Sequence, residues 1–319
     1  MAAAANPFAH LLAVAREVSF LKGAELVRQG EVSRGAFLIR AGAVEARVAL
    51  PGGGALTVAQ FRDGDMFCEM ALIECGVASA TVVAQSNVDA WFIGRDDFRA
   101  LVASREIAAL ETQRAITRTL ADRLRALNAR VQEHPAGEDR PYADAAPAGD
   151  PLAGVKRSRH ASFDWKAFVP VLPFFEGFDA DEADELLSLG KVLELPRGAL
   201  EIFTRNEAMQ RRVAIAGPGE LVGFMAVITG APRANHARAR EACCLLELPR
   251  AAFMELYEGN SGATVSLHHA IHRSLLRSIS RTNTQLTRLI AHARLGAATA
   301  RAVELEAALH AQLWRADAG

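Results

Sequence analysis

The chain has 319 residues, 50% of them hydrophobic and 23% charged, which is typical of globular proteins with a core and excludes a disordered chain. Its 36 Lys and Arg residues balance 37 Asp and Glu residues, and a formal net charge of -1 excludes a whole-protein attraction to nucleic acid or to an anionic membrane. The four cysteines are too few and too irregularly spaced for a disulfide framework or a zinc site.

The first segment, 1–19, has no basic residue before its apolar stretch, so it lacks the pattern of a secretory signal. No run of about 18 apolar residues occurs in the sequence, which predicts that no segment spans a bilayer. We therefore expect a cytoplasmic protein without a membrane partner.

Short apolar runs separated by turn residues follow in the first third of the chain. They lie at 25–27, 35–39, 44–50 and 56–61, and a Pro-Gly-Gly-Gly turn stands at 51–54. Many short strands with turns at this spacing predict an antiparallel roll or sandwich.

After Phe98 the pattern changes to that of a helix. Seven positions follow alternating steps of three and four, with two polar residues near the start of the series: Leu110, Gln113, Thr117, Leu120, Leu124, Leu127 and Val131. Such a heptad seam predicts a long helix that pairs with another helix, in this chain or in a second one. Packing of the helix on its own domain is the alternative.

The next segment, 132–162, contains four Pro, three Gly and seven Ala and has no periodic apolar pattern. This composition predicts a flexible linker. A basic cluster ends it at 156–160, which we interpret as a solvated boundary rather than a docking site.

The chain then repeats itself. Residues 64–73 match 219–228 at a constant offset of 155, and the same offset relates Arg95 to Arg250 and Leu120 to Leu275. Nearer the start of each copy the best offset is 175, so the second copy is about 20 residues shorter. The deletion falls opposite 26–48 and predicts a missing strand pair.

The second copy carries its own heptad seam, formed by His272, Leu275, Ile279, Thr282, Leu286 and Leu289. We expect a first domain at 1–131, the linker at 132–162, a shortened second domain at 163–291 and an Ala-rich helical tail at 292–319.

A predicted roll, the sequence Gly-Asp-x-Phe-x-Glu-x-Ala-Leu at 64–72 and a long helix together resemble the cyclic nucleotide-binding domain family. That family includes catabolite activator-like regulators and kinase regulatory subunits. The resemblance covers 11–131 well, with Gly23, Gly30, Gly42 and Gly64 at turn positions, and 172–289 less completely. It implies an α+β fold of two antiparallel β jelly-roll domains, each followed by a long helix. It also implies cyclic AMP or cyclic GMP as ligand and a regulatory role in signal transduction.

The family's phosphate cassette implies a ligand-binding role for specific residues. A short helix presents backbone N–H groups to the cyclic phosphate, and a Gly at its start permits close approach. The following Glu accepts from the ribose, and an Arg nine residues later binds the phosphate. The corresponding residues are Phe67, Cys68, Glu69, Met70, Ala71, Ala78, Ser79 and Ala80 in the first copy, and Gly223 and Arg233 in the second.

Each copy departs from this pattern. The first keeps Glu69 and Ser79 but has Cys68 in place of the Gly and Ala78 in place of the Arg; the second keeps the Gly and the Arg but has Phe224 in place of the Glu. A hydrogen bond to a charged group contributes about 1.5–3 kcal/mol, so losing the Arg weakens phosphate binding about tenfold to a hundredfold or more. Cyclic nucleotide binding, vestigial pockets, and a different anion or nucleotide variant in the first pocket all remain open.

Cysteine and histidine chemistry gives weaker signals. A helix N-terminus beside Cys68 and Cys75 would lower the pKa of a thiol and make it redox-sensitive, although two half-buried small residues are the favoured interpretation. His268, His269 and His272 share one helical region, and we do not assign them a metal. No nucleophile and base occur in a known catalytic arrangement, so we expect no enzyme.

Arg273, Arg277 and Arg281 form a basic stripe along the second predicted helix. A solvated helix face is favoured over contact with phosphates. After residue 289 the chain reads as further helix without a turn and a recognition helix, so we do not expect DNA binding.

These observations lead to one functional hypothesis and two alternatives. The hypothesis is a non-enzymatic sensor: a ligand at 67–81 favours one placement of the helix 110–131 and so changes pairing with a second copy or a protein partner. One alternative is a ligand-free dimerising scaffold. The other is a transcription regulator of the catabolite activator type without its own DNA reader.

Overall fold

The computed structural model describes residues 8–50, 53–73, 77–133, 140–141, 169–205, 209–233 and 235–316. The first copy opens with a short 3-10 helix, η1 (Ala9–Val14), and continues into two four-stranded antiparallel sheets with the orders β1-β8-β3-β6 and β2-β7-β4-β5. The strands are β1 (Ala15–Phe20), β2 (Glu25–Val27), β3 (Gly35–Ala41), β4 (Val44–Ala49), β5 (Ala55–Phe61), β6 (Met66–Phe67), β7 (Thr81–Ala84) and β8 (Val88–Gly94).

The two sheets of the first copy share one apolar core. Phe37 and Phe67 from one sheet lie in the same buried cluster as Val44 and Val82 from the other. The turn from β3 to β4 requires Gly42, which has φ +107°, and a Cβ there would lie 2.3 Å from the carbonyl oxygen of Asn87. The predicted antiparallel sheets are confirmed, and the jelly-roll arrangement stays a prediction.

Three helices complete the first copy: α1 (Met70–Ile73), α2 (Arg95–Ala103) and α3 (Ile107–Gln132). Helix α3 spans the predicted heptad seam, and all seven seam residues are buried. The change to helix after Phe98 is therefore present, although α2 begins slightly earlier, at Arg95.

The second copy begins with η3 (Pro173–Phe175) and α4 (Ala180–Leu189), which Asp179 and Glu182 start with a reciprocal capping box. Its strands are β10 (Lys191–Arg205), β11 (Met209–Ala216) and β12 (His236–Glu247), and its short helices are α5 (Phe224–Thr229) and α6 (Arg250–Glu258). Together with β9 (Arg140–Pro141), the strands form an antiparallel sheet in the order β12-β10-β11-β9.

The second copy is shortened at the place that the change of offset predicts, where a strand pair is missing. At the offset of 155, β11 corresponds to β5, and β12 corresponds to β7 and β8 together. Only residues 206–208, which lie outside the described part, separate β10 from β11, so there is no room for equivalents of β3 and β4.

The predicted linker and tail are only partly described. Within 132–162, residues 134–139 and 142–162, including the basic cluster, lie outside the described residues, whereas Arg140–Pro141 form β9 and pair with β11. The expected tail is helical to Ala316 and continues α7 (Gly262–Ala316) without a break.

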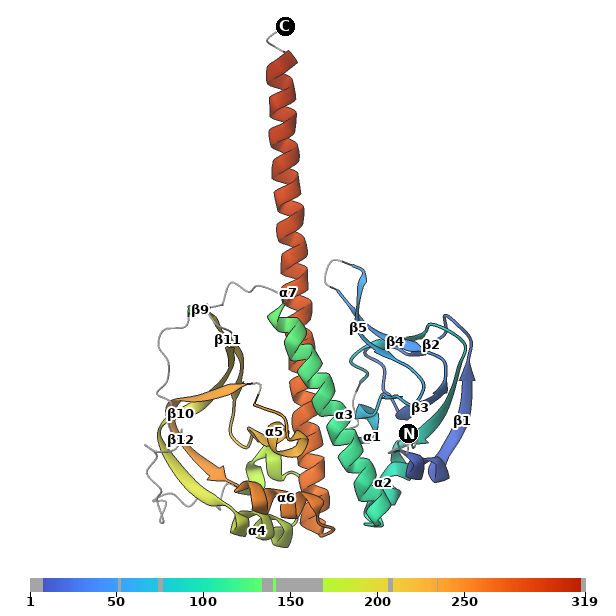
Figure 1. Cartoon of the computed structure of the whole chain (residues 1–319), viewed down its shortest axis with the longest axis vertical. Helices are drawn as coiled ribbons and strands as arrows, with labels where there is room; N and C mark the ends of the chain where they lie inside the picture. Colours follow the sequence, from blue (N-terminus) through green and yellow to red (C-terminus); the bar gives the residue numbers. More distant parts are fainter. Residues whose placement is uncertain are drawn as a thin grey trace.

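Helix α7 and helix α3 form the centre of the molecule. Figure 1 shows α3 running alongside the first half of α7, with the sheets of the two copies on opposite sides, while the second half of α7 projects beyond both. Leu120 and Leu124 of α3 share one buried cluster with Leu275 and Ile279 of α7. The predicted helix pairing therefore occurs between the two copies. Among the described residues, no helix has the length and apolar content needed to cross a bilayer.

Candidate functional site

The first cassette has the predicted strand-to-helix shape. Strand β6 pairs with β3, Phe67 stacks on Phe37 with ring centroids 5.0 Å apart, and α1 starts three residues later at Met70. Ala71 and Ala80 are buried with Phe67, so their side chains shape the core next to the cassette. The remainder of the loop, 74–76 with Cys75, lies outside the described residues.

Cys68 stands at the bend between β6 and α1 with φ +59°, a conformation that side chains other than glycine rarely adopt. Burial, followed by the charge of Glu69, raises the pKa of its thiol to about 12, against the smaller opposing effects of Arg123 and Ser33. The idea that this thiol has a lowered pKa is therefore wrong, because desolvation outweighs any effect of the four-residue helix.

Glu69 is the functional group that the fold places most distinctively. Its side chain is fully buried, and Oε1 accepts a hydrogen bond from Nη1 of Arg123 on α3. Oε2 has no partner among the described residues. The guanidinium of Arg123 also lies over the ring of Phe61, 5.0 Å from its centroid. The site therefore holds a buried carboxylate with one oxygen that lacks a hydrogen-bond partner among the described residues.

Sequence reasoning missed Arg123. It lies 54 residues after Glu69, and its only signal was its position directly before the seam residue Leu124. A charged residue at the edge of a buried seam is held there by a partner, and the pattern does not say which one.

The segment around Ala78 is fixed by its backbone. The N–H of Ala78 donates to the carbonyl of Glu31 at 2.7 Å, and its own carbonyl accepts from the N–H of Gly30 at 2.9 Å. Ser79 Oγ lies 3.9 Å from the sulfur of Met70, a weak contact. At the position of the family's phosphate-binding arginine the first cassette thus presents only a methyl group.

The second cassette keeps the glycine and the arginine together. Gly223 has φ +86° and precedes α5, and Phe224, at the position of Glu69, is buried. A Cβ at Gly223 would lie only 2.8 Å from Nη1 of Arg233. The guanidinium therefore occupies the space that a side chain at 223 would need.

The two cassettes are related by a paired exchange. The offset of 155 equates Gly223 with Cys68 and Arg233 with Ala78. A Cβ at the first position would crowd the end of the arginine at the second, so the exposed guanidinium would have to shift, whereas the pairs Gly with Arg and Cys with Ala avoid this contact. The two departures of the first copy thus fall at positions that are in contact in the second copy.

The three histidines lie at the contact between the copies and are not grouped as metal ligands among the described residues. His268 Nε2 donates to the carbonyl of Tyr257 at 2.8 Å, and its Nδ1 lies 3.1 Å from the side-chain amide of Gln113. Burial lowers the pKa of His268 to about 4 and the pKa of His272 well below its ordinary value. Both rings are therefore neutral hydrogen-bonding groups at neutral pH.

The basic stripe is partly engaged within the chain. Arg273 donates to the carbonyls of Phe174 and Glu176, and Arg281 donates to the carboxylate of Glu220 at 2.9 Å. Arg277 is exposed. Two of the three arginines thus hold elements of the second copy against α7.

Comparison with known proteins adds a family match. The family model described as Cyclic nucleotide-binding domain matches residues 17–105 and 194–260. The Patatin-like phospholipase domain-containing protein 6 of Mus musculus and that of Homo sapiens are each 32% identical over 94 residues, which is 29% of this chain. The chain spans only 7% of the length of these curated relatives.

Two solved structures are similar to parts of the chain. The Thermus thermophilus Catabolite Activator Protein has 25% sequence identity and a TM-score of 0.36, over 41% of this chain and 60% of that one. The regulatory domain of Toxoplasma gondii PKA, in a co-crystal structure with cAMP, has 17% identity and a TM-score of 0.29, over 83% and 88%.

Proposed function

We propose that the chain is a non-enzymatic sensor of the cyclic nucleotide-binding domain family, whose first cassette couples a nucleotide-like ligand to α3; the two segments that match the family model support this. The family is regulatory rather than catalytic. In this function the ligand binds at the cassette around Glu69, and the response is a change in the pairing of α3 with α7.

The contact between Glu69 and Arg123 supports this assignment most directly. It joins the cassette to the pairing helix through a buried ion pair, and Arg123 is only 19% exposed. A ligand hydroxyl that donates to the unpaired Oε2 would satisfy a buried acceptor and share the carboxylate with Arg123. Binding then changes the strength of the contact between Glu69 and Arg123 on α3. If the ligand has a higher affinity for one placement of α3, it increases the population of that placement.

The first cassette is better suited to bind the ribose hydroxyl of a nucleotide than its phosphate. Glu69 supplies an acceptor for a ribose hydroxyl, while Ala78 offers no charge to a phosphate. We therefore expect weaker binding of cyclic AMP and cyclic GMP than a complete cassette gives, by about tenfold to a hundredfold.

Calorimetric titration of the full chain with cyclic AMP and cyclic GMP tests the proposal. Glu69→Gln removes the charge and one acceptor, and we expect it to weaken binding at least tenfold. Glu45→Gln is the matched control, because Glu45 is also a buried carboxylate of the first copy paired with an arginine, Arg47, and should leave the affinity unchanged. An absence of both heat and a thermal shift at millimolar ligand would remove the sensor and leave the ligand-free scaffold.

A further inference from the structure

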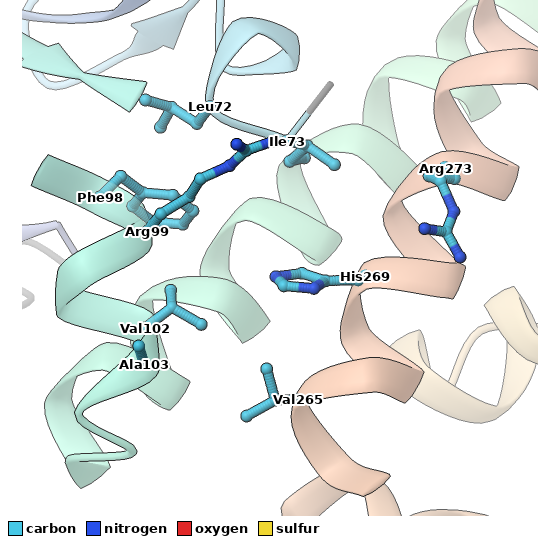
Figure 2. Close-up of a pocket in the computed structure, with 9 residues that line it drawn as sticks. All are labelled: Leu72, Ile73, Phe98, Arg99, Val102, Ala103, Val265, His269 and Arg273. Carbon is cyan, nitrogen blue, oxygen red and sulfur yellow. The ribbon is translucent and has the colours of Figure 1, made fainter. Parts of the chain in front are cut away.

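A cavity lies between the first copy and α7, away from Glu69. Its volume is about 310 Å³, which is at the lower end of the range for small-molecule sites. Figure 2 shows its lining: apolar side chains that include Phe98, Val102 and Val265, together with the nitrogen-bearing side chains of Arg99, His269 and Arg273. The walls come from α1 and α2 of the first copy and from α7 of the second.

The repeat explains why this cavity is open. At the offset of 155, His269 corresponds to Arg114 on α3. Arg114 reaches the end of α6 and donates to the carbonyls of Tyr257, Glu258 and Gly259, the middle one at 2.6 Å. The guanidinium of Arg114 therefore fills the space between α3 and α6. On the other side the shorter imidazole of His269 leaves the corresponding space between α7 and α2 empty.

The positive charge of the cavity between α2 and α7 also has no full counterpart at the equivalent contact between α6 and α3. Arg99 on α2 corresponds to Met254 on α6, so only the open side carries an arginine at this position. Burial is the largest cause that lowers the pKa of His269. The charges of Arg273 and Arg99 lower this pKa further, and the charge of Glu182 raises it. Both guanidinium groups are thus close enough to act on the centre of the cavity.

The two arginines differ in how far they are engaged. Arg273 already donates to the carbonyl of Glu176, which holds its guanidinium at the wall. Arg99 is exposed at the opposite wall. The neutral imidazole of His269 stands between them in Figure 2. This arrangement offers one available guanidinium and one N–H donor, which suits a single negative charge better than a phosphate dianion.

We propose that this cavity binds a small organic carboxylate, with its charged end at Arg99 and His269 and its apolar part against Phe98, Val102 and Val265. The ligand bridges α2 and α7, so binding stabilises the placement of the first copy against α7 seen in this structure. The site requires no ligand at Glu69, and its failure is separate from that of the proposed sensor.

Titration of the full chain with octanoate, followed by calorimetry and by thermal unfolding, tests the proposal. We expect saturable binding and a raised midpoint of unfolding with octanoate, and neither with octanol, which has the same chain without the charge. Arg99→Met, which introduces the residue found at the matching position of the second copy, should weaken octanoate binding at least tenfold. Arg277→Met removes an exposed arginine that does not line the cavity and should leave binding unchanged.

Filling the cavity provides the decisive variant. His269→Arg introduces the residue that closes the opposite side, and it should abolish octanoate binding while the chain remains folded. Val265→Phe fills the apolar end and should have the same effect on binding if His269→Arg does not fold. Equal affinity of the filled variants and the wild-type chain, or an absence of binding to the wild-type chain at millimolar octanoate, would overturn the proposal.

Discussion

His272 of α7 and Thr117 of α3 are 155 residues apart, the offset that aligns the two copies, and His272 Nε2 lies 2.7 Å from Thr117 Oγ1. His268 and Gln113 have the same separation in sequence and are also in contact, at 3.1 Å. Equivalent residues of two parallel helices meet in this way only near an approximate two-fold axis between them. The chain therefore pairs its two copies in the manner of two subunits of a symmetric dimer.

The buried histidines at this axis make stability depend on pH. Burial lowers the pKa of His268 from 6.5 to about 4, and the pKa of His272 falls well below 6.5 for the same first reason. Between pH 6.5 and about pH 4 the imidazole of His268 is protonated in the unfolded chain but not in the folded chain. The contribution of this neutral buried ring to the free energy of unfolding is therefore fully present above pH 6.5 and decreases as the pH falls towards 4. Each ring contributes a slope of up to about 1.4 kcal/mol per pH unit.

Urea unfolding between about pH 7 and about pH 5 measures this slope. His268→Gln should reduce the slope, whatever its effect on absolute stability. His292→Gln is the control, because His292 is exposed on α7 and should leave the slope unchanged. A wild-type slope no steeper than that of His268→Gln would contradict the prediction.

The repeat and its helices could be predicted from the sequence because they depend on local signals. Periodicity identified the buried face of α3, and the change of offset identified the missing strand pair. Periodicity shows which face of a helix is buried but does not show its partner. The contact of His272 with Thr117 and the pairing of Glu69 with Arg123 therefore appeared only in three dimensions.

The effect of Cys68 illustrates a second limit. Its place beside a short helix suggested a lowered thiol pKa, but burial has the larger and opposite effect. Cys68 packs against the buried cluster that contains Phe37 and Val82, which lie far from it in sequence, so no local pattern contains its burial.

Helix pairing within one chain makes a specific prediction for Leu120, which is fully buried in the cluster that also contains Leu275. Leu120→Ala should lower the free energy of unfolding by about 2–5 kcal/mol through lost contacts and a cavity. Leu21→Ala should have almost no effect, because Leu21 is 75% exposed. The unfolding midpoint should not vary with protein concentration. A midpoint that rises with concentration would show that pairing between chains contributes.

The Cys68 thiol should be unreactive in the folded chain. With a pKa raised to about 12, almost none of it is thiolate at neutral pH, and the thiolate is the nucleophile. Iodoacetamide labelling followed by mass spectrometry should leave Cys68 unmodified in the native chain and modify it in urea. Rapid labelling of Cys68 without denaturant would show that the site opens or that its thiol is not desolvated.

Restoring a phosphate grip in the first cassette should require two changes together. A Cβ at Gly223 would lie 2.8 Å from Nη1 of Arg233, so we expect the side chain of Cys68 to displace an arginine at the position of Ala78 from the placement that Arg233 has in the second cassette. Ala78→Arg alone should therefore gain little affinity for cyclic AMP. Ala78→Arg combined with Cys68→Gly should gain about tenfold to a hundredfold, the effect of one hydrogen bond to a charged group. Cys68→Gly alone is the control, since it relieves the positive φ without adding charge. Additive effects of the two single substitutions would show that the positions are independent, because contact between them requires a coupling term.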